Sequence, residues 1–198
     1  MSRVAELPFN EWDADLRSLV HEDSGSPLEK KARGVLANAP HIAMANAAFL
    51  GTALQRCKLP RRLIELVRLR IAFHNQCRSC MAMRFQSAVE DGLTQDLVCS
   101  LEKPMEAPNL TKAEKAALEY ADVFATNHFA INDETFRKLR QFFTEGQIVE
   151  LGVLTGYFVG FGRFLASLDI VEELPEVYQD KSRKVGPWES AESVVVRG

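Results

Sequence analysis

The sequence has no long hydrophobic run. Its longest apolar stretch covers residues 151–162 and is bounded by Glu150 and Arg163. A helix that crosses a bilayer needs about 20 apolar residues, so we expect this stretch to be part of a buried helix. Residues 1–12 also have no apolar segment of the length that a secretory signal requires. We therefore expect a cytoplasmic protein without a membrane partner.

The chain also has no large excess of one charge and few cysteines. Its formal net charge is −3, which gives no electrostatic basis for a nucleic-acid partner. It contains four cysteines. Structural disulfides are rare in the cytoplasm, so a closely spaced pair there is more often catalytic, redox-sensing or metal-binding. Cys57 and Cys99 have no partner at such a spacing, and we expect both to be small buried residues.

Runs of alternating β-branched residues are missing except at residues 193–197, and helix signals occur throughout the rest of the chain. Capping boxes begin at Ser26, Thr111 and Thr144, each followed three residues later by Glu or Gln. Apolar residues between these signals recur at spacings of three and four, which is typical of helices. The pattern predicts helices near residues 28–38, 40–57, 61–75, 77–91, 94–101, 112–127, 133–142 and 145–168. The expected fold is an all-α, single-domain helical bundle.

The division of the chain follows from this pattern. We expect an N-terminal extension over residues 1–25, the helical domain over 26–174 and a C-terminal tail over 175–198. The tail is polar and lacks a strong period, so we expect it to be ordered only where it packs on another surface, such as a neighbouring subunit.

The motif with the clearest chemistry is Cys77-x-x-Cys80, which brings two sulfur atoms to one helical turn. The pair has three interpretations: two small buried residues, a redox dithiol, or part of a zinc site with His74 as a third ligand. A thioredoxin fold is disfavoured because no βαβ pattern surrounds the motif. The start of a helix at Cys77 favours the thiolate of that residue. Arg84, one turn beyond Cys80, favours the thiolate of Cys80, so the sequence does not rank the two thiols.

A carboxylate precedes the dithiol in a strongly apolar helix. Glu65 has Arg61 four residues before it and Arg68 three residues after it. An ordinary helix ion pair is the first interpretation of this pattern. The alternative is a partly buried carboxylate whose raised proton affinity suits a general base.

Glycine recurs at Gly152, Gly156 and Gly160 on one face of the last predicted helix. Glycine costs about 1 kcal/mol in a helix interior relative to alanine, so this ridge indicates close approach of another helix. That helix lies either in the same subunit or in a neighbouring one. Arg163 on the same helix needs a partner, which we expect to be a carboxylate such as Glu65, or else an anionic substrate.

Residues 63–93, "LIELVRLRIAFHNQCRSCMAMRFQSAVEDGL", resemble the carboxymuconolactone decarboxylase superfamily, and in particular its alkyl hydroperoxidase D-like, peroxidase-related branch. The family pattern is Glu, eleven residues, Cys-x-x-Cys, three residues, His. Weaker similarity extends over most of the chain, from about residue 38 to residue 170. The resemblance implies an all-helical antioxidant protein that assembles into trimers or hexamers and uses neither a cofactor nor a metal.

The resemblance also implies the roles of the site residues. Cys80 would be the thiolate that attacks a peroxide, Cys77 the resolving thiol and Glu65 the proton acceptor, and an external thiol or dithiol protein would be the reductant. One position departs from the family pattern, because Arg84 stands where the family has its relay histidine. Arginine stays charged and holds an anion in place, but it does not shuttle protons. His74 is the nearest histidine that could substitute.

Two rival functions remain open from the sequence. One is a non-catalytic, redox-sensing helical oligomer. The other is a decarboxylase or isomerase that acts on a small carboxylate bound by Arg84 or Arg163, although decarboxylase members of the family generally lack the dithiol.

Overall fold

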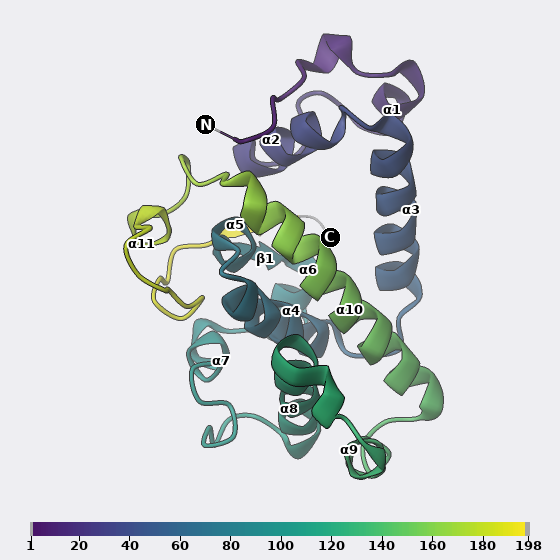
Figure 1. Cartoon of the computed structure of the whole chain (residues 1–198), viewed down its shortest axis with the longest axis vertical. Helices are drawn as coiled ribbons and strands as arrows, with labels where there is room; N and C mark the ends of the chain where they lie inside the picture. The colour runs from purple at the N-terminus through teal and green to yellow at the C-terminus, as the bar shows by residue number, and fades with distance from the viewer. Residues whose placement is uncertain (1, 197–198) are drawn as a thin grey trace.

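The structure is a computed structural model that describes residues 2–196 (Figure 1). Its helices are α1 (Ala14–Ser18), α2 (Pro27–Leu36), α3 (Pro40–Arg56), α4 (Arg61–Asn75), α5 (Arg78–Ala82), α6 (Gln86–Glu90), α7 (Gln95–Cys99), α8 (Lys112–Asn127), α9 (Asp133–Leu139), α10 (Glu145–Leu168) and α11 (Glu176–Gln179). Two 3-10 turns, Phe9–Glu11 and His128–Ala130, and two short strands, β1 (Met83–Phe85) and β2 (Val194–Val196), complete it. The all-α prediction is confirmed.

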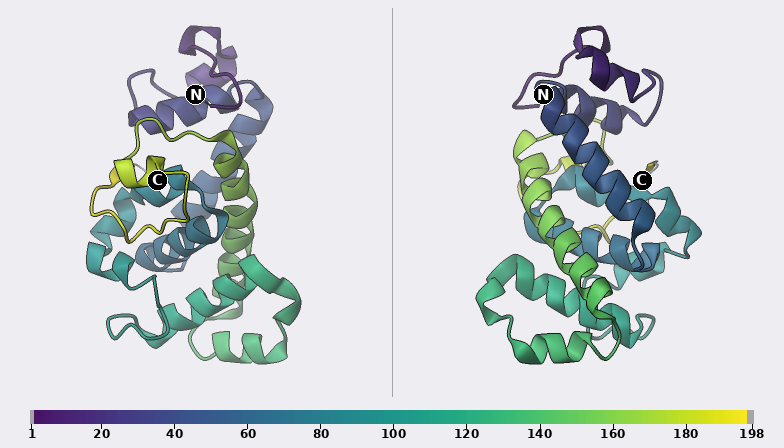
Figure 2. Two further views of the ribbon diagram at one scale, coloured as in Figure 1. Left: turned by 60° about the vertical axis from the view of Figure 1, so that its left-hand side comes forward. Right: turned by 90° about the vertical axis from the view of Figure 1, so that its right-hand side faces the viewer.

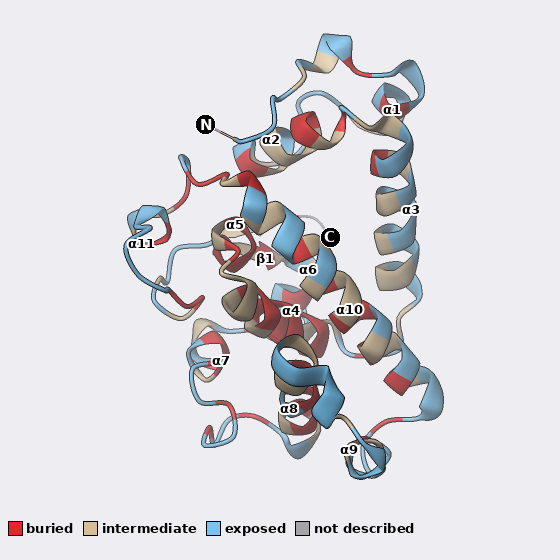
Figure 3. Ribbon diagram, viewed as in Figure 1, coloured by how far each residue is buried: buried red, intermediate tan, exposed pale blue. Residues whose placement is uncertain are grey.

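The centre of the molecule is α4, which packs against α8 and α10. Most residues of α4 from Leu63 to Ala72 are buried, and Leu66, Leu69 and Ile71 are fully enclosed. Figure 3 shows α4 as the most continuously buried helix of the bundle. The residues that directly follow α4, which include Cys77 and Cys80, therefore begin at the end of a core helix.

The predicted capping boxes are present at the starts of α2, α8 and α10. At each start a Ser26, Thr111 or Thr144 hydroxyl accepts a hydrogen bond from the third helical N–H, and the Glu or Gln side chain returns the bond to the cap. These local signals place the helix starts within two residues of the prediction.

The predicted helix over residues 77–91 is wrong, because the chain forms α5, β1 and α6 there. In a continuous helix the N–H of Arg84 would donate to the carbonyl of Cys80. Instead Arg68 occupies that carbonyl, and it also binds the carbonyl of Met83, which is extended with ψ of 150°. β1 then pairs in parallel with β2, with Arg84 opposite Val195.

The C-terminal tail packs on the domain of its own chain over its described residues 175–196. Tyr178 of α11 is fully buried, and Val185 joins the apolar cluster that contains Cys77 and Cys80. Figure 2 shows this segment, in yellow-green to yellow, wrapped around α5. Contact of the tail with a neighbouring subunit stays a prediction, as do the boundaries at residues 25 and 174.

The glycine ridge of α10 packs partly within the chain. A Cβ on Gly152 would lie 3.2 Å from Tyr120 Oη, and one on Gly156 would lie 3.6 Å from Phe124 Cζ, both on α8. A Cβ on Gly160 would meet nothing within 4 Å. Close packing inside the subunit therefore explains Gly152 and Gly156 but not Gly160.

By length and composition, α10 is also the helix of residues 2–196 that is long and apolar enough to cross a membrane. The core helix of a soluble protein meets the same test. α10 packs along α4 and α8, but only 33% of its apolar window is buried within the described chain, so the expectation of a buried helix holds only in part. α10 spans Glu145–Leu168 and so extends beyond both ends of the uninterrupted apolar run at residues 151–162.

Candidate functional site

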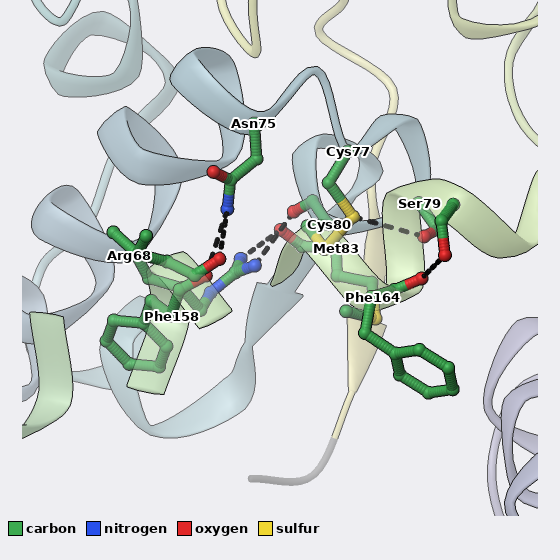
Figure 4. Close-up of a disulfide and its surroundings, with 10 residues drawn as sticks. Arg68, Asn75, Cys77, Ser79, Cys80, Met83, Phe158 and Phe164 are labelled. Carbon is green, nitrogen blue, oxygen red and sulfur yellow. Dashed lines mark hydrogen bonds between the residues drawn. A yellow bond between two sulfur atoms is a disulfide. The ribbon is translucent and has the colours of Figure 1, made fainter. Parts of the chain in front are cut away.

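The dithiol lies where the chain leaves α4 and turns into α5. Gln76 ends α4 in the left-handed conformation, with φ of 49°, and the N–H of Cys77 donates to the carbonyl of Ala72 at 3.0 Å. Cys77 is then the N-cap of α5, as expected from the sequence. Cys77 and Cys80 form a disulfide, with Cα atoms 5.2 Å apart (Figure 4). The pair can therefore switch between dithiol and disulfide within one helical turn.

The two sulfur-bearing residues differ in access. Cys77 is 0% exposed, and the Oγ of Ser79 lies 3.6 Å from its sulfur. Cys80 is 7% exposed and lines a cavity of about 100 Å³. The cavity is walled mainly by apolar and aromatic side chains of α3, α4, β1 and α10, namely Leu50, Ala72, Met83, Phe85, Tyr157, Phe158, Phe161 and Leu165. Its volume is about that of three water molecules, and Cys80 but not Cys77 is part of its wall.

Glu65 is fully buried and forms an ion pair with Arg68. The Nε and Nη2 atoms of Arg68 each lie 2.7 Å from one carboxylate oxygen of Glu65. The backbone N–H of Phe85 donates to the same carboxylate at 3.1 Å. The helix ion pair suggested by the sequence is therefore present, with Arg68 and not Arg61 as the partner. Glu65 reaches the dithiol only through Arg68, whose Nη1 donates to the carbonyl of Cys80 at 2.8 Å.

Arg84 lies on β1, away from the helical turn above Cys80 that the sequence suggested. Its guanidinium donates to the carbonyls of Met81 and Met83 at 2.6 and 2.8 Å and to the carbonyl of Pro187 in the tail at 3.2 Å. Burial lowers the pKa of Arg84, and the positive charge of Arg68 lowers it further, while Glu65 opposes the shift. Arg84 thus links the dithiol segment to the tail.

His74 faces α8 and not the dithiol cavity. Its Nε2 lies 2.7 Å from Asp122 Oδ1, and Arg70 binds both oxygens of the same carboxylate. Burial acts to raise the pKa of Asp122, but the hydrogen bonds from His74 and Arg70 outweigh it and hold the pKa below its usual value. The structure therefore groups His74 with Asp122 and does not bring it to Cys80.

The expected pairing of Arg163 with Glu65 is wrong. Arg163 donates from Nε to the Oδ1 of Asn75 and from Nη2 to the carbonyl of Ala125. Among residues 2–196, no three His, Cys, Asp or Glu side chains are grouped so that they could hold a metal ion. Sequence reasoning missed the contact of Arg68 with the dithiol segment and the contribution of α10 to the cavity. The i, i+3 spacing from Glu65 placed Arg68 on the correct face, but gave no sign of its reach to Cys80.

The tail is fastened to residues around the dithiol. The side chain of Gln76 donates to the carbonyl of Val185 and accepts from its N–H, each at 3.1 Å. Arg78 donates to the carbonyls of Asp180 and Arg183. Burial raises the pKa of the Tyr178 phenol, although the adjacent Arg84 opposes this. The tail therefore packs against the segment that carries Cys77.

The chain is similar to known proteins in part of its sequence and in its fold. The sequence model of the carboxymuconolactone decarboxylase family matches residues 40–123. An uncharacterized protein found in two strains of Mycobacterium tuberculosis is 35% identical over 89 residues, which are 44% of this chain and 31% of the relative. The match thus spans about a third of the length of these curated relatives.

Two crystal structures have the same fold. One is an uncharacterized peroxidase-related protein from Ralstonia eutropha with an alkylhydroperoxidase AhpD core; it has a TM-score of 0.72 and 16% identity and covers 90% of this chain and 94% of its own. The other is a protein of unknown function from Agrobacterium tumefaciens, for which an AhpD role in antioxidant defence has been suggested. It has a TM-score of 0.60 and 23% identity and covers 71% of this chain and 94% of its own.

Fold and site together define an all-α protein of the alkyl hydroperoxidase D-like type that carries a Cys-x-x-Cys pair. Over residues 40–123 the chain is similar in sequence to the carboxymuconolactone decarboxylase family.

Proposed function

We propose that the protein is a thiol-dependent peroxide reductase. The observation that supports this function best is the pairing of Cys77 with Cys80 in a disulfide whose Cys80 side opens on a small, mostly apolar cavity. Two cysteines used only as small apolar residues have no need of such an opening. The family includes decarboxylases as well as redox proteins, and the dithiol favours redox chemistry.

The access of the two thiols assigns their roles. Cys80, at the cavity, attacks the terminal oxygen of the peroxide as a thiolate and becomes a sulfenic acid. Cys77 then attacks the sulfur of Cys80; the S–S bond forms, the S–O bond breaks, and the hydroxide that leaves takes up the proton of Cys77 as water. Two electrons and two protons from an external thiol or dithiol protein restore the reduced pair.

Glu65, His74 and Arg84 are the other predicted site residues, and the contacts of each support a different role. Proton acceptance by Glu65 stays a prediction, and both of its oxygens are bound to Arg68 or to the N–H of Phe85. A relay through His74 also stays a prediction, and it requires a path from the Asp122 pair to the cavity. The hydrogen bonds of Arg84 to Met81 and to Pro187 suit a role in which Arg84 holds the tail in place and adds a positive charge next to the segment that carries the dithiol.

The proposal includes assembly into a cytoplasmic homo-oligomer, a trimer or a hexamer. Several large apolar side chains of α3 and α10 are exposed in the single chain, namely Ile42, Phe49, Val149, Val153 and Phe164. A third of the apolar window of α10 is buried within the chain. Exposed apolar side chains gathered on two neighbouring helices are typical of subunit interfaces.

The test is peroxide consumption by the purified protein with a dithiol reductant, for the wild type and the Cys80→Ser and Cys77→Ser variants. We expect turnover in the wild type, no peroxide reaction in Cys80→Ser, and a single oxidation event without turnover in Cys77→Ser. Conversion of a small carboxylate that survives loss of both thiols would support the decarboxylase or isomerase instead. Reversible oxidation without turnover would support the redox sensor.

A further inference from the structure

Arg68 is the charged residue in the wall of the cavity beside Cys80, as far as residues 2–196 describe that wall. The residue is 5% exposed, and one face of the guanidinium lies over the ring of Phe85, with Cζ 5.0 Å from the ring centroid. In Figure 4 the guanidinium points from α4 toward the backbone of Cys80 and Met83. A buried cation that faces a cavity next to a reactive sulfur is in position to contact whatever enters.

The hydrogen bonds of Arg68 account for four of its N–H groups. A guanidinium has five. Nε and one N–H of Nη2 bind Glu65, the other N–H of Nη2 binds the carbonyl of Met83, and one N–H of Nη1 binds the carbonyl of Cys80. One N–H of Nη1 is left, on the atom that already contacts the backbone of the attacking cysteine.

We propose that Arg68 binds the peroxide beside Cys80 by donating this remaining N–H to the oxygen that leaves. This inference rests on the proposed function and adds a catalytic residue to it. Arg68 stays protonated throughout, because it acts as a hydrogen-bond donor and a positive charge and not as a proton shuttle. Such a donor replaces part of what the family histidine would provide at position 84.

The step balances as follows. The Cys80 thiolate attacks the terminal, hydroxyl-bearing oxygen of the hydroperoxide, an S–O bond forms and the O–O bond breaks. The electron pair of the broken bond stays on the departing oxygen, whose negative charge the N–H of Arg68 stabilises until water supplies a proton. Cys80 is oxidised by two electrons to the sulfenic acid, and the peroxide is reduced to an alcohol, or to water from hydrogen peroxide.

Glu65 acts in this scheme as a positioning residue. Its two hydrogen bonds fix the plane of the Arg68 guanidinium, and the N–H of Phe85 fixes the carboxylate. Glu65, Arg68 and Arg84 are at least 95% buried, and one carboxylate with two guanidinium groups leaves a net charge of +1. Tyr157 in the cavity wall and Tyr178 beside Arg84 add no charge near pH 7, because burial raises the pKa of each phenol. A Cys80 thiolate supplies the missing negative charge.

The experiment compares two reactions of the same thiol. In a Cys77→Ser background, the second-order rate constant for oxidation of Cys80 is measured with hydrogen peroxide, which is small enough for the cavity. The rate of alkylation by uncharged iodoacetamide is measured in parallel. One variant is Arg68→Lys, which keeps the positive charge but loses the several N–H donors of the guanidinium. The other is the double variant Glu65→Gln with Arg68→Gln, which removes both charges of the ion pair together, so that neither is left buried without its partner. Arg62→Lys is the matched control, because Arg62 is also on α4 and binds a buried carboxylate, Glu114, away from the cavity.

We expect peroxide oxidation to fall roughly 100-fold in Arg68→Lys, which is the usual loss for one donor to a developing oxyanion. Alkylation should stay within about twofold, because the positive charge remains. Arg62→Lys should change neither rate. The double variant should lose peroxide oxidation too, and it provides the test if Arg68→Lys does not fold.

A different result would overturn the inference. If the peroxide and alkylation rates fall by the same factor in Arg68→Lys, Arg68 serves only the fold or the thiolate. If neither rate falls, Arg68 does not contact the peroxide. If the parent protein with intact Arg68 is not oxidised at Cys80 at all, the proposed function itself is wrong.

Discussion

Gly186 lies directly against the indole of Trp188. A Cβ on Gly186 would lie 2.2 Å from the Cε2 atom of Trp188, so no larger residue fits without moving the ring. The indole in turn packs on Phe73 of α4, with ring centroids 4.8 Å apart. This small turn therefore fastens the tail to the helix that leads into the dithiol.

The first prediction concerns access of the reductant. Gly186→Ala should displace Trp188, loosen residues 175–196 and uncover Cys77, at a cost in unfolding free energy of about 1–3 kcal/mol, as is usual for overpacking. We expect faster reduction of the Cys77–Cys80 disulfide by a small dithiol protein and faster proteolysis of the tail. Gly146→Ala is the control, because a Cβ there meets nothing within 4 Å. A loosened tail with an unchanged rate of disulfide reduction would show that the tail does not limit access.

The second prediction concerns the pH dependence of stability. The pKa of Asp122 is lowered in the folded protein, so its contribution is fully present above the unfolded pKa of about 3.9. That contribution is lost as the pH falls toward the folded pKa. Asp122→Asn should therefore lower the free energy of unfolding at pH 6, and the difference from the wild type should shrink below pH 4. Urea unfolding at several pH values measures this.

The exposed carboxylate Asp23, which has no hydrogen-bond or ion-pair partner among the described residues, gives the control Asp23→Asn. That variant should track the wild type at every pH. A gap between Asp122→Asn and the wild type that stays constant down to pH 3 would mean that the contacts of Asp122 with His74 and Arg70 do not depend on its charge.

The third prediction concerns the two cysteines outside the motif. Cys99 is exposed, so the expectation that it is buried is wrong, and Cys57 is half-buried. Burial raises the pKa of the Cys57 thiol, and its Sγ lies 3.2 Å from a carboxylate oxygen of Glu150. A maleimide added to the oxidised protein at pH 7 should label Cys99 well before Cys57, as peptide mass spectrometry can show. Earlier labelling of Cys57 would contradict the described environment of both thiols.

Much of the fold follows from local signals. The capping boxes and the many apolar residues of α4 depend on positions within one or two helical turns, so the sequence alone predicts α2, α4, α8 and α10 closely. The break after α5 depends on Arg68, which precedes Met83 by 15 residues, and on β2 near the far end of the chain. No local pattern contains that information. A continuous helix would place Arg84 one turn beyond Cys80, and the break in the helix places it on β1 instead.

The site was predictable in its residue types but not in its connections. The Cys77-x-x-Cys80 spacing left a redox dithiol as one of three interpretations, and the resemblance to the family favoured it and added Glu65. The Glu65–Arg68 pair was one of two readings of that helix. The contact of Arg68 Nη1 with the carbonyl of Cys80 depends on how α5 is oriented against α4, which a spacing rule does not specify.

The fourth prediction concerns assembly. Val153 on α10 is exposed in the single chain. Val153→Arg should abolish a trimer or hexamer, because a charge in the centre of an apolar interface stays unpaired, while the circular dichroism of the variant matches that of the wild type. Light scattering after size-exclusion chromatography gives the mass. Lys112→Arg, on an exposed site at the start of α8, is the control. A monomeric wild type would refute the predicted oligomer.

The most direct test of the account is a brief peroxide pulse on the fully reduced protein, followed by alkylation and peptide mass spectrometry. The account predicts that Cys77 and Cys80 lose two hydrogens and become linked, while Cys57 and Cys99 are recovered alkylated. It also predicts that Cys77→Ser stops at a sulfenic acid on Cys80. Recovery of both Cys77 and Cys80 as alkylated thiols, or a sulfenic acid that forms first on Cys77, would contradict it.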